Sequence, residues 1–165
     1  MMDKSGLSPE LELIAQSVVQ ANARIRFFRL AFGAAGSESR QNLAETRAIL
    51  SDLVKGTKLA MDWDTGSDLT RAEVKLAFLL VMCLESALPY GGRIAISARD
   101  GQWALQAQAD RLKLDTDLWA VLAEPLPSRD VTAAEVHFPL AAAEMARQGR
   151  RLQAELGQTA IRLSY

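Results

Sequence analysis

The chain has 165 residues, of which 49% are apolar and 24% are charged, so it fits one soluble globular domain, or one domain with a short appendage. Its 19 basic and 20 acidic residues nearly balance, which argues against a nucleic-acid binder, because such proteins need a basic surface. With one cysteine and one histidine it has neither a disulfide framework nor a four-ligand zinc site, and we expect no metal.

The sequence also indicates where the protein resides. The longest apolar stretch, residues 76–84, is too short to cross a membrane, and no signal peptide opens the chain. The only cysteine, Cys83, lies inside that apolar stretch, as expected of a protein from a reducing compartment. We therefore expect a cytoplasmic protein that does not bind membranes.

The first predicted element is a helix over residues 8–32, which Ser8 caps and Pro9 opens. Its apolar residues recur alternately three and four positions apart, as in a coiled-coil seam; they are Leu11, Ile14, Val18, Ala21, Ile25, Phe28 and Phe32. Such a seam needs a partner helix from the rest of the fold or from another chain. Further apolar residues widen it, which favours a four-helix bundle.

After a connector rich in Gly, Ala and Ser, the pattern changes to mixed helices and strands. The expected order is a helix at 43–54 ended by Gly56, a strand at 59–63, and a core helix that runs to residue 88 from a capping box of Thr70 and Glu73. Asp100 and Gly101, which separate two alternating runs at 93–99 and 103–109, predict a hairpin.

The last third of the chain predicts two more helices and a second hairpin. A short helix at 118–122 ends before Pro125 and Pro127, and a capping box of Thr132 and Glu135 opens the last helix. Pro139 predicts a kink or a broken first turn there. A closing hairpin pairs 150–156 with 159–165, and five strands with three main helices predict one mixed sheet covered by helices on one face.

This order resembles the core of sensor histidine kinases, in which a helical dimerisation arm precedes a GHKL-type ATPase sandwich. Residues 25–35 (IRFFRLAFGAA) and 84–92 (LESALPYGG) are similar to the ChpT family of alphaproteobacterial histidine phosphotransferases. The resemblance implies an α+β protein with a dimerisation helix at 1–35 and a degenerate ATPase-like α/β sandwich, with a five-stranded mixed sheet, at 36–165. It also implies a homodimer that passes phosphoryl groups between a hybrid histidine kinase's receiver domain and downstream response regulators.

The nucleotide motifs of such kinases are degraded here. Where an active kinase has a magnesium-binding asparagine in a pattern such as Asn-Ala-Leu-Lys-Tyr, this chain reads Ser86-Ala87-Leu88-Pro89-Tyr90. Residues 110–114 and 130–134, at the places expected for two glycine-rich boxes, contain no glycine, so the backbone cannot approach phosphates closely. We expect no cofactor and no ATP binding, which disfavours the alternative of an ATP-binding GHKL kinase or ATPase.

The phosphoacceptor of the family is a histidine of a His-Asp pair on a first bundle helix, and residues 1–7 correspond at most to the end of that helix. We expect a truncated chain, rather than a natural variant that has lost phosphotransfer, with no catalytic residue of its own. His137 is the only imidazole that could substitute, but its apolar neighbours and Pro139 favour a structural role. A non-catalytic adaptor that binds receiver domains remains the alternative.

Three arginines on the first helix, Arg24, Arg26 and Arg29, form a basic cluster, with Arg40 beyond the connector. A charge cluster on a helix is often only a solvated face. In a bundle hairpin, however, this half of the helix lies beside the phosphoacceptor, so the three arginines are candidates for docking the acidic pocket of a receiver domain. Cys83 and the three tryptophans, Trp63, Trp103 and Trp119, are expected to be core residues.

Overall fold

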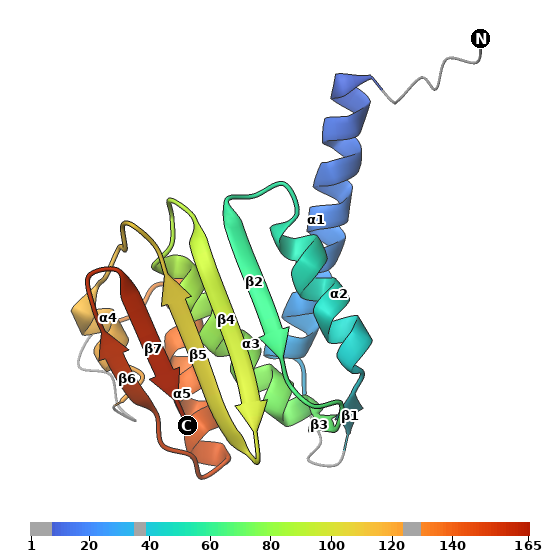
Figure 1. The fold of residues 1–165 in the computed structure, drawn as a ribbon. Coiled ribbons are helices and arrows are strands. Elements are labelled where there is room, and N and C mark those ends of the chain that lie inside the picture. Colours follow the sequence, from blue (N-terminus) through green and yellow to red (C-terminus); the bar gives the residue numbers. More distant parts are fainter. Residues whose placement is uncertain (1–7, 35–38, 124–129) are drawn as a thin grey trace.

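The computed structural model describes residues 8–34, 39–123 and 130–165 and shows a sheet with helices on one face (Figure 1). The sheet contains, in spatial order, β2 (Leu59–Asp64), β4 (Gly92–Arg99), β5 (Gln102–Gln108), β7 (Ala160–Ser164) and β6 (Gln153–Leu156). β2 pairs with β4 in parallel and the other neighbours are antiparallel, which confirms the predicted five-stranded mixed sheet.

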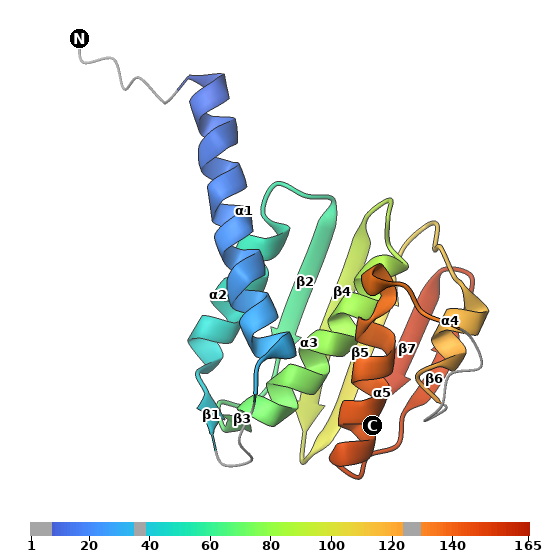
Figure 2. The ribbon, with the colours of Figure 1, turned by 180° about the vertical axis from the view of Figure 1, so that it is seen from behind.

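The helices on the covered face are α1 (Pro9–Phe32), α2 (Leu43–Val54), α3 (Arg71–Ser86), α4 (Thr116–Ala120) and α5 (His137–Arg147), as the view from behind shows (Figure 2). They begin largely where the capping residues predict. The Ser8 side chain accepts a hydrogen bond from the backbone N–H of Leu11, and Thr70 with Glu73 forms the expected capping box. No helix in the described ranges is both long and apolar enough to cross a membrane.

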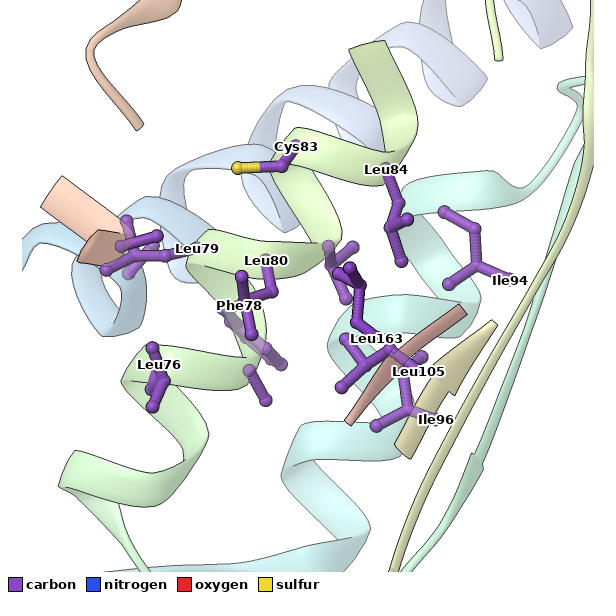
Figure 3. Packing of buried hydrophobic residues seen from close by; sticks show 14 of the residues in the cluster. Leu76, Phe78, Leu79, Leu80, Cys83, Leu84, Ile94, Ile96, Leu105 and Leu163 are labelled. Atoms are coloured by element: carbon purple, nitrogen blue, oxygen red, sulfur yellow. The ribbon is translucent and has the colours of Figure 1, made fainter. Parts of the chain in front are cut away.

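α3 forms the centre of the hydrophobic core, as expected from its nearly uniform apolar sequence. Leu76, Leu80 and Leu84 are fully buried, and Ile94 of β4 lies opposite Leu84 (Figure 3). Cys83 is also fully buried, and burial raises the pKa of its thiol well above the ordinary value. Trp63, Trp103 and Trp119 are buried as well, so the prediction that they are core residues is confirmed.

Three details differ from the sequence-based expectations. The connector contains a short strand, β1 (Arg40–Gln41), that pairs with β3 (Leu69–Thr70), and strands of two residues leave no readable alternation. α4 starts two residues earlier than expected because Asp115 caps it, whereas Pro125 and Pro127 lie outside the described residues. The end of the chain forms the expected hairpin, but all four residues of β6 are exposed.

Pro139 breaks the last helix in the expected manner. The capping box of Thr132 and Glu135 opens a 3-10 turn, Ala133–Glu135, and the α-helix starts again at His137. Pro139 therefore lies in the first turn of α5, where a backbone N–H would have no helical acceptor in any case. The helix ends before Gly149, whose φ of 66° suits a glycine at a helix terminus.

α1 is packed against the sandwich along only half of its length. Its C-terminal half buries Ala23, Phe27, Leu30 and Ala31 beside α2 and α3, whereas its N-terminal half projects beyond the sheet (Figures 1 and 2). The ring of Phe27 stacks on that of Phe78 of α3, with centroids 4.4 Å apart and an angle of 8° between the planes. The buried half of α1 is thus part of the same core as the sheet.

Candidate functional site

The exposed side of α1 carries the apolar stripe that the sequence predicts. Leu11, Ile14, Val18 and Ile25 are each between 50% and 59% exposed, and Phe28 is 38% exposed. At about 100° per residue, this stripe lies on the side of the helix opposite the buried Ala23, Phe27, Leu30 and Ala31. α1 therefore has two apolar faces, of which the sandwich covers one.

Large apolar side chains are otherwise rarely exposed in the described part of the chain. Beyond α1 they are limited to Tyr90, Val136, Leu140 and Leu156. On the outer face of the sheet, the strand register places alanine, serine, glutamine and charged residues, with ion pairs from Asp62 to Arg93 and from Asp64 to Arg99. The α1 stripe is thus the apolar surface that most clearly lacks a cover.

The three arginines of the predicted docking cluster are placed differently from one another. Both terminal nitrogens of Arg24 donate to the carboxylate of Glu85 on α3, at 3.0 and 3.4 Å. Arg26 donates to Asp52 on α2 at 2.7 Å. Arg29 is exposed and forms no ion pair within the described ranges. The sandwich therefore engages two of the three arginines and leaves the third open to solvent.

The carboxylate partners of Arg24 and Arg26, Glu85 and Asp52, are not among the residues that the sequence singles out. A signal for Glu85 was present, because it is the only charged residue between positions 76 and 88 of a buried helix. A carboxylate in such surroundings is expected to have a cationic partner. Asp52 gave no comparable signal, since a charged residue on a surface helix is ordinary.

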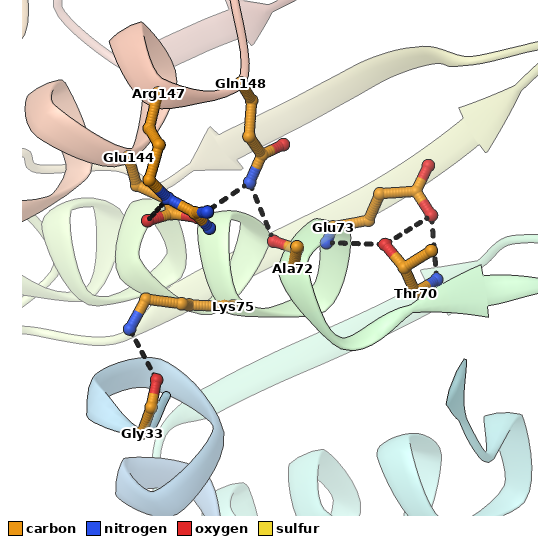
Figure 4. A network of polar contacts seen from close by, with 8 residues as sticks. All are labelled: Gly33, Thr70, Ala72, Glu73, Lys75, Glu144, Arg147 and Gln148. Atoms are coloured by element: carbon orange, nitrogen blue, oxygen red, sulfur yellow. Dashed lines mark hydrogen bonds and ion pairs between the residues drawn. The ribbon is translucent and has the colours of Figure 1, made fainter. Parts of the chain in front are cut away.

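A polar network joins the end of α1, α3 and α5 (Figure 4). Lys75 of α3 donates to the carbonyl of Gly33, the C-cap of α1, at 2.7 Å. The buried Glu144 of α5 accepts hydrogen bonds from Arg147 and Gln148, and Gln148 also donates to the carbonyl of Ala72. Burial raises the pKa of Glu144, but these hydrogen bonds and nearby positive charges outweigh burial and lower it overall.

The end of α3, where a kinase binds magnesium, is occupied by contacts within the protein. The Ser86 hydroxyl donates to the carbonyl of Cys83 at 2.6 Å, and the Glu85 carboxylate is held by Arg24. The backbone of Lys113, in the first glycine-free segment, donates to the carbonyl of Ala87 at 2.9 Å. No group of three or more histidine, cysteine, aspartate or glutamate side chains suited to a metal ion occurs in the described residues.

His137 lies at the start of α5 and is 7% exposed. Its Nε2 atom is buried and has no hydrogen-bond partner in the part of the chain that the structure describes. Burial lowers the pKa of His137, although the nearby carboxylates of Glu85 and Glu135 oppose this effect. A buried imidazole on α5 does not present a nucleophile to a partner protein, which agrees with the structural role expected for it.

Comparison with solved structures shows the fold. A structure described as that of a bacterial phosphotransferase superposes with a TM-score of 0.79 over 93% of this chain and 77% of that chain, at 19% sequence identity. The histidine kinase AdeS of Acinetobacter baumannii gives a TM-score of 0.52 at 12% identity, covering 93% of this chain and 75% of that one. The sheet and helices thus have the arrangement of histidine kinase ATPase-like domains.

Comparison of sequences identifies the family. The chain is 28% identical, over 99 residues, to the protein phosphotransferase ChpT of Brucella abortus (strain 2308). The aligned region covers 58% of this chain and 47% of that protein. The chain therefore spans about half the length of this curated relative. The family model described as the histidine phosphotransferase C-terminal domain matches residues 43–160, which include helices α2 to α5 and four of the five strands of the main sheet and end at the first residue of β7. By this match, the chain belongs to the histidine phosphotransferase C-terminal domain family, as its similarity to ChpT indicates.

Proposed function

We propose that this chain is the dimerising and receiver-docking part of a cytoplasmic phosphorelay histidine phosphotransferase. Its partners are a second copy of itself, the receiver domain of a hybrid histidine kinase, and the receiver domains of downstream response regulators. The observation that carries the proposal is the apolar stripe of α1, which faces away from a sandwich of the histidine phosphotransferase family.

The stripe supports a homodimer built on a helical bundle. Its spacing suits helix-to-helix packing, and α1, with 24 residues, is about 36 Å long. The outer face of the sheet is less suited to be the dimer interface, because it carries short and charged side chains rather than large apolar ones. Residues Leu11, Ile14, Val18, Ile25 and Phe28 form the proposed seam between the two copies.

Arg24, Arg26 and Arg29 are the proposed receiver-docking residues. Receiver domains carry a cluster of carboxylates around their phosphorylated aspartate, and guanidinium groups pair with carboxylates in a directional, bidentate way. The three side chains lie on the half of α1 that packs on the sandwich, and Arg29 is open to solvent there. Complementary charge of this kind speeds encounter and selects the partner.

The chain itself is not expected to carry the phosphoryl group. Transfer from an aspartyl phosphate needs an accessible imidazole in line with the phosphorus atom. The sequence has one histidine, and it is buried on α5. We also propose that the sandwich binds no ATP, so that it serves as a scaffold and has no autokinase activity.

The test combines binding with transfer of a radiolabel. The chain is titrated with purified receiver domains from the same genome by calorimetry, and is then incubated with the same domains after they have been phosphorylated. We expect binding to at least one receiver domain and no label on the chain. Label that is lost in His137→Ala, with the variant's fold verified by circular dichroism, would contradict the structural role of His137. Absence of binding to every receiver domain would refute the docking function.

A further inference from the structure

The ion pairs of Arg24 and Arg26 border the buried face of α1 on its two sides. Arg24 reaches toward α3 and pairs with Glu85, whereas Arg26 reaches toward α2 and pairs with Asp52. Both carboxylates belong to the sandwich and both arginines belong to α1. The two pairs therefore link the helix that is proposed to dock receivers to the body of the same protein.

These pairs are weak enough to be exchanged. The Arg24 and Glu85 side chains are 37% and 25% exposed, and those of Arg26 and Asp52 are 36% and 37% exposed. Ion pairs with this access to water contribute little to stability, because solvent screens them and each side chain loses rotamer freedom. A guanidinium group released from one carboxylate can pair with another at little net cost.

We propose that Glu85 and Asp52 compete with an acidic receiver domain for Arg24 and Arg26, and so limit the affinity of docking. The inference rests on the docking function proposed above. Arg24 and Arg26 lie outside the apolar stripe, and each can contact a receiver domain only when it leaves its carboxylate partner in the sandwich. By thermodynamic linkage, a docked receiver domain weakens the attachment of α1 to the sandwich to the same extent.

The experiment removes the negative charge of each competing side chain and keeps the size and shape of that side chain. Glu85→Gln, Asp52→Asn and the double variant are titrated with the receiver domain that binds the unmodified chain most tightly. We expect each single variant to bind about threefold more tightly and the double variant about tenfold, as for release of partly exposed ion pairs. High salt should remove the gain, because it screens the charges involved.

A matched control separates competition from a general loss of negative charge. Glu45→Gln removes one carboxylate from α2, the same helix as Asp52, and Glu45 forms no ion pair with Arg24 or Arg26. This variant should leave receiver affinity within error. In addition, Arg24→Ala should reduce affinity more in the Glu85→Gln background than in the unmodified chain, because Arg24 is then free to dock.

The outcomes distinguish the two proposals. If a receiver domain binds the unmodified chain but binds folded Glu85→Gln and Asp52→Asn equally or less tightly, the competition is refuted and the docking function stands. An equal gain in Glu45→Gln would likewise refute it, because the effect would then be one of net charge. If no receiver domain binds the unmodified chain, both proposals are wrong.

Discussion

His137 illustrates how a single buried side chain makes stability depend on pH. Burial lowers its pKa below the ordinary value of 6.5, so the unfolded chain takes up a proton at a higher pH than the folded chain does. Well above pH 6.5 the imidazole is neutral in both states and has no effect. As the pH falls below that value, protons favour the unfolded state and the free energy of unfolding decreases.

We therefore predict that His137→Leu flattens this decline. Denaturant unfolding of both proteins between pH 7.5 and pH 5 checks it, a range chosen to stay above the ordinary pKa of 4.5 of Glu144. At pH 7 the variant should be about as stable as the unmodified chain, because the substitution removes a buried nitrogen that has no partner in the described residues. An equal decline in both proteins would show that His137 is not its source.

The individual residues also show what the sequence could and could not predict. The apolar stripe of α1 and the burial of Cys83 follow from apolar spacing and composition, and both are observed. The sequence left open whether the rest of the fold covers the stripe. The pairs of Arg24 with Glu85 and of Arg26 with Asp52 join residues 61 and 26 positions apart. Such distant contacts depend on how the helices pack, and one sequence does not reveal that packing.

At the scale of elements, α1 carries the prediction about assembly. Ile14→Asp together with Val18→Asp places two charges in the exposed stripe, so a dimer that buries this stripe should dissociate. Sedimentation equilibrium at tens of micromolar should show a dimer for the unmodified chain and a monomer for the variant.

The matched control for this prediction is Val19→Asp. Val19 is also exposed on α1 but lies about a third of a turn from the stripe, so the variant matches the single substitution Val18→Asp in charge and in loss of helix propensity. It should remain dimeric. A monomeric unmodified chain would refute the proposed seam.

The main helices and strands could be predicted because each has a local signal. Capping residues mark the starts of α1 and α3, and Asp100 with Gly101 marks the β4–β5 turn, where both have positive φ values. β1 and β3 were missed because each is two residues long and stable only through its pairing with the other. The spatial order of the strands and the parallel pairing of β2 with β4 were not predicted, because short-range patterns in the sequence do not specify them.

At the scale of the whole molecule, the described residues have the arrangement of histidine kinase ATPase-like domains, and we propose that they bind no nucleotide. Ser86 is bonded to Cys83, Glu85 is paired with Arg24, and the two segments at the places of the glycine-rich boxes contain no glycine. Calorimetric titration with a non-hydrolysable ATP analogue and magnesium should therefore show no binding. A dissociation constant below about 100 µM, which corresponds to a binding free energy of about 5.5 kcal/mol, would contradict this prediction. It would favour the alternative of an ATP-binding kinase or ATPase.

A continuous series of aromatic rings crosses the molecule from the free face of α1 to the end of the chain. Neighbouring centroids are between 4.4 and 6.2 Å apart, in the order Phe32, Phe28, Phe27, Phe78, Trp63, Trp103 and Tyr165. The indole rings of Trp63 and Trp103 lie 5.7 Å apart at 68°, so we expect their electronic transitions to couple and to give a near-ultraviolet circular dichroism signal that depends on this geometry. Because Phe78 contacts both Trp63 and Phe27 of α1, the protein contains its own optical reporter of how α1 sits on the sandwich, and no dye has to be attached to follow it.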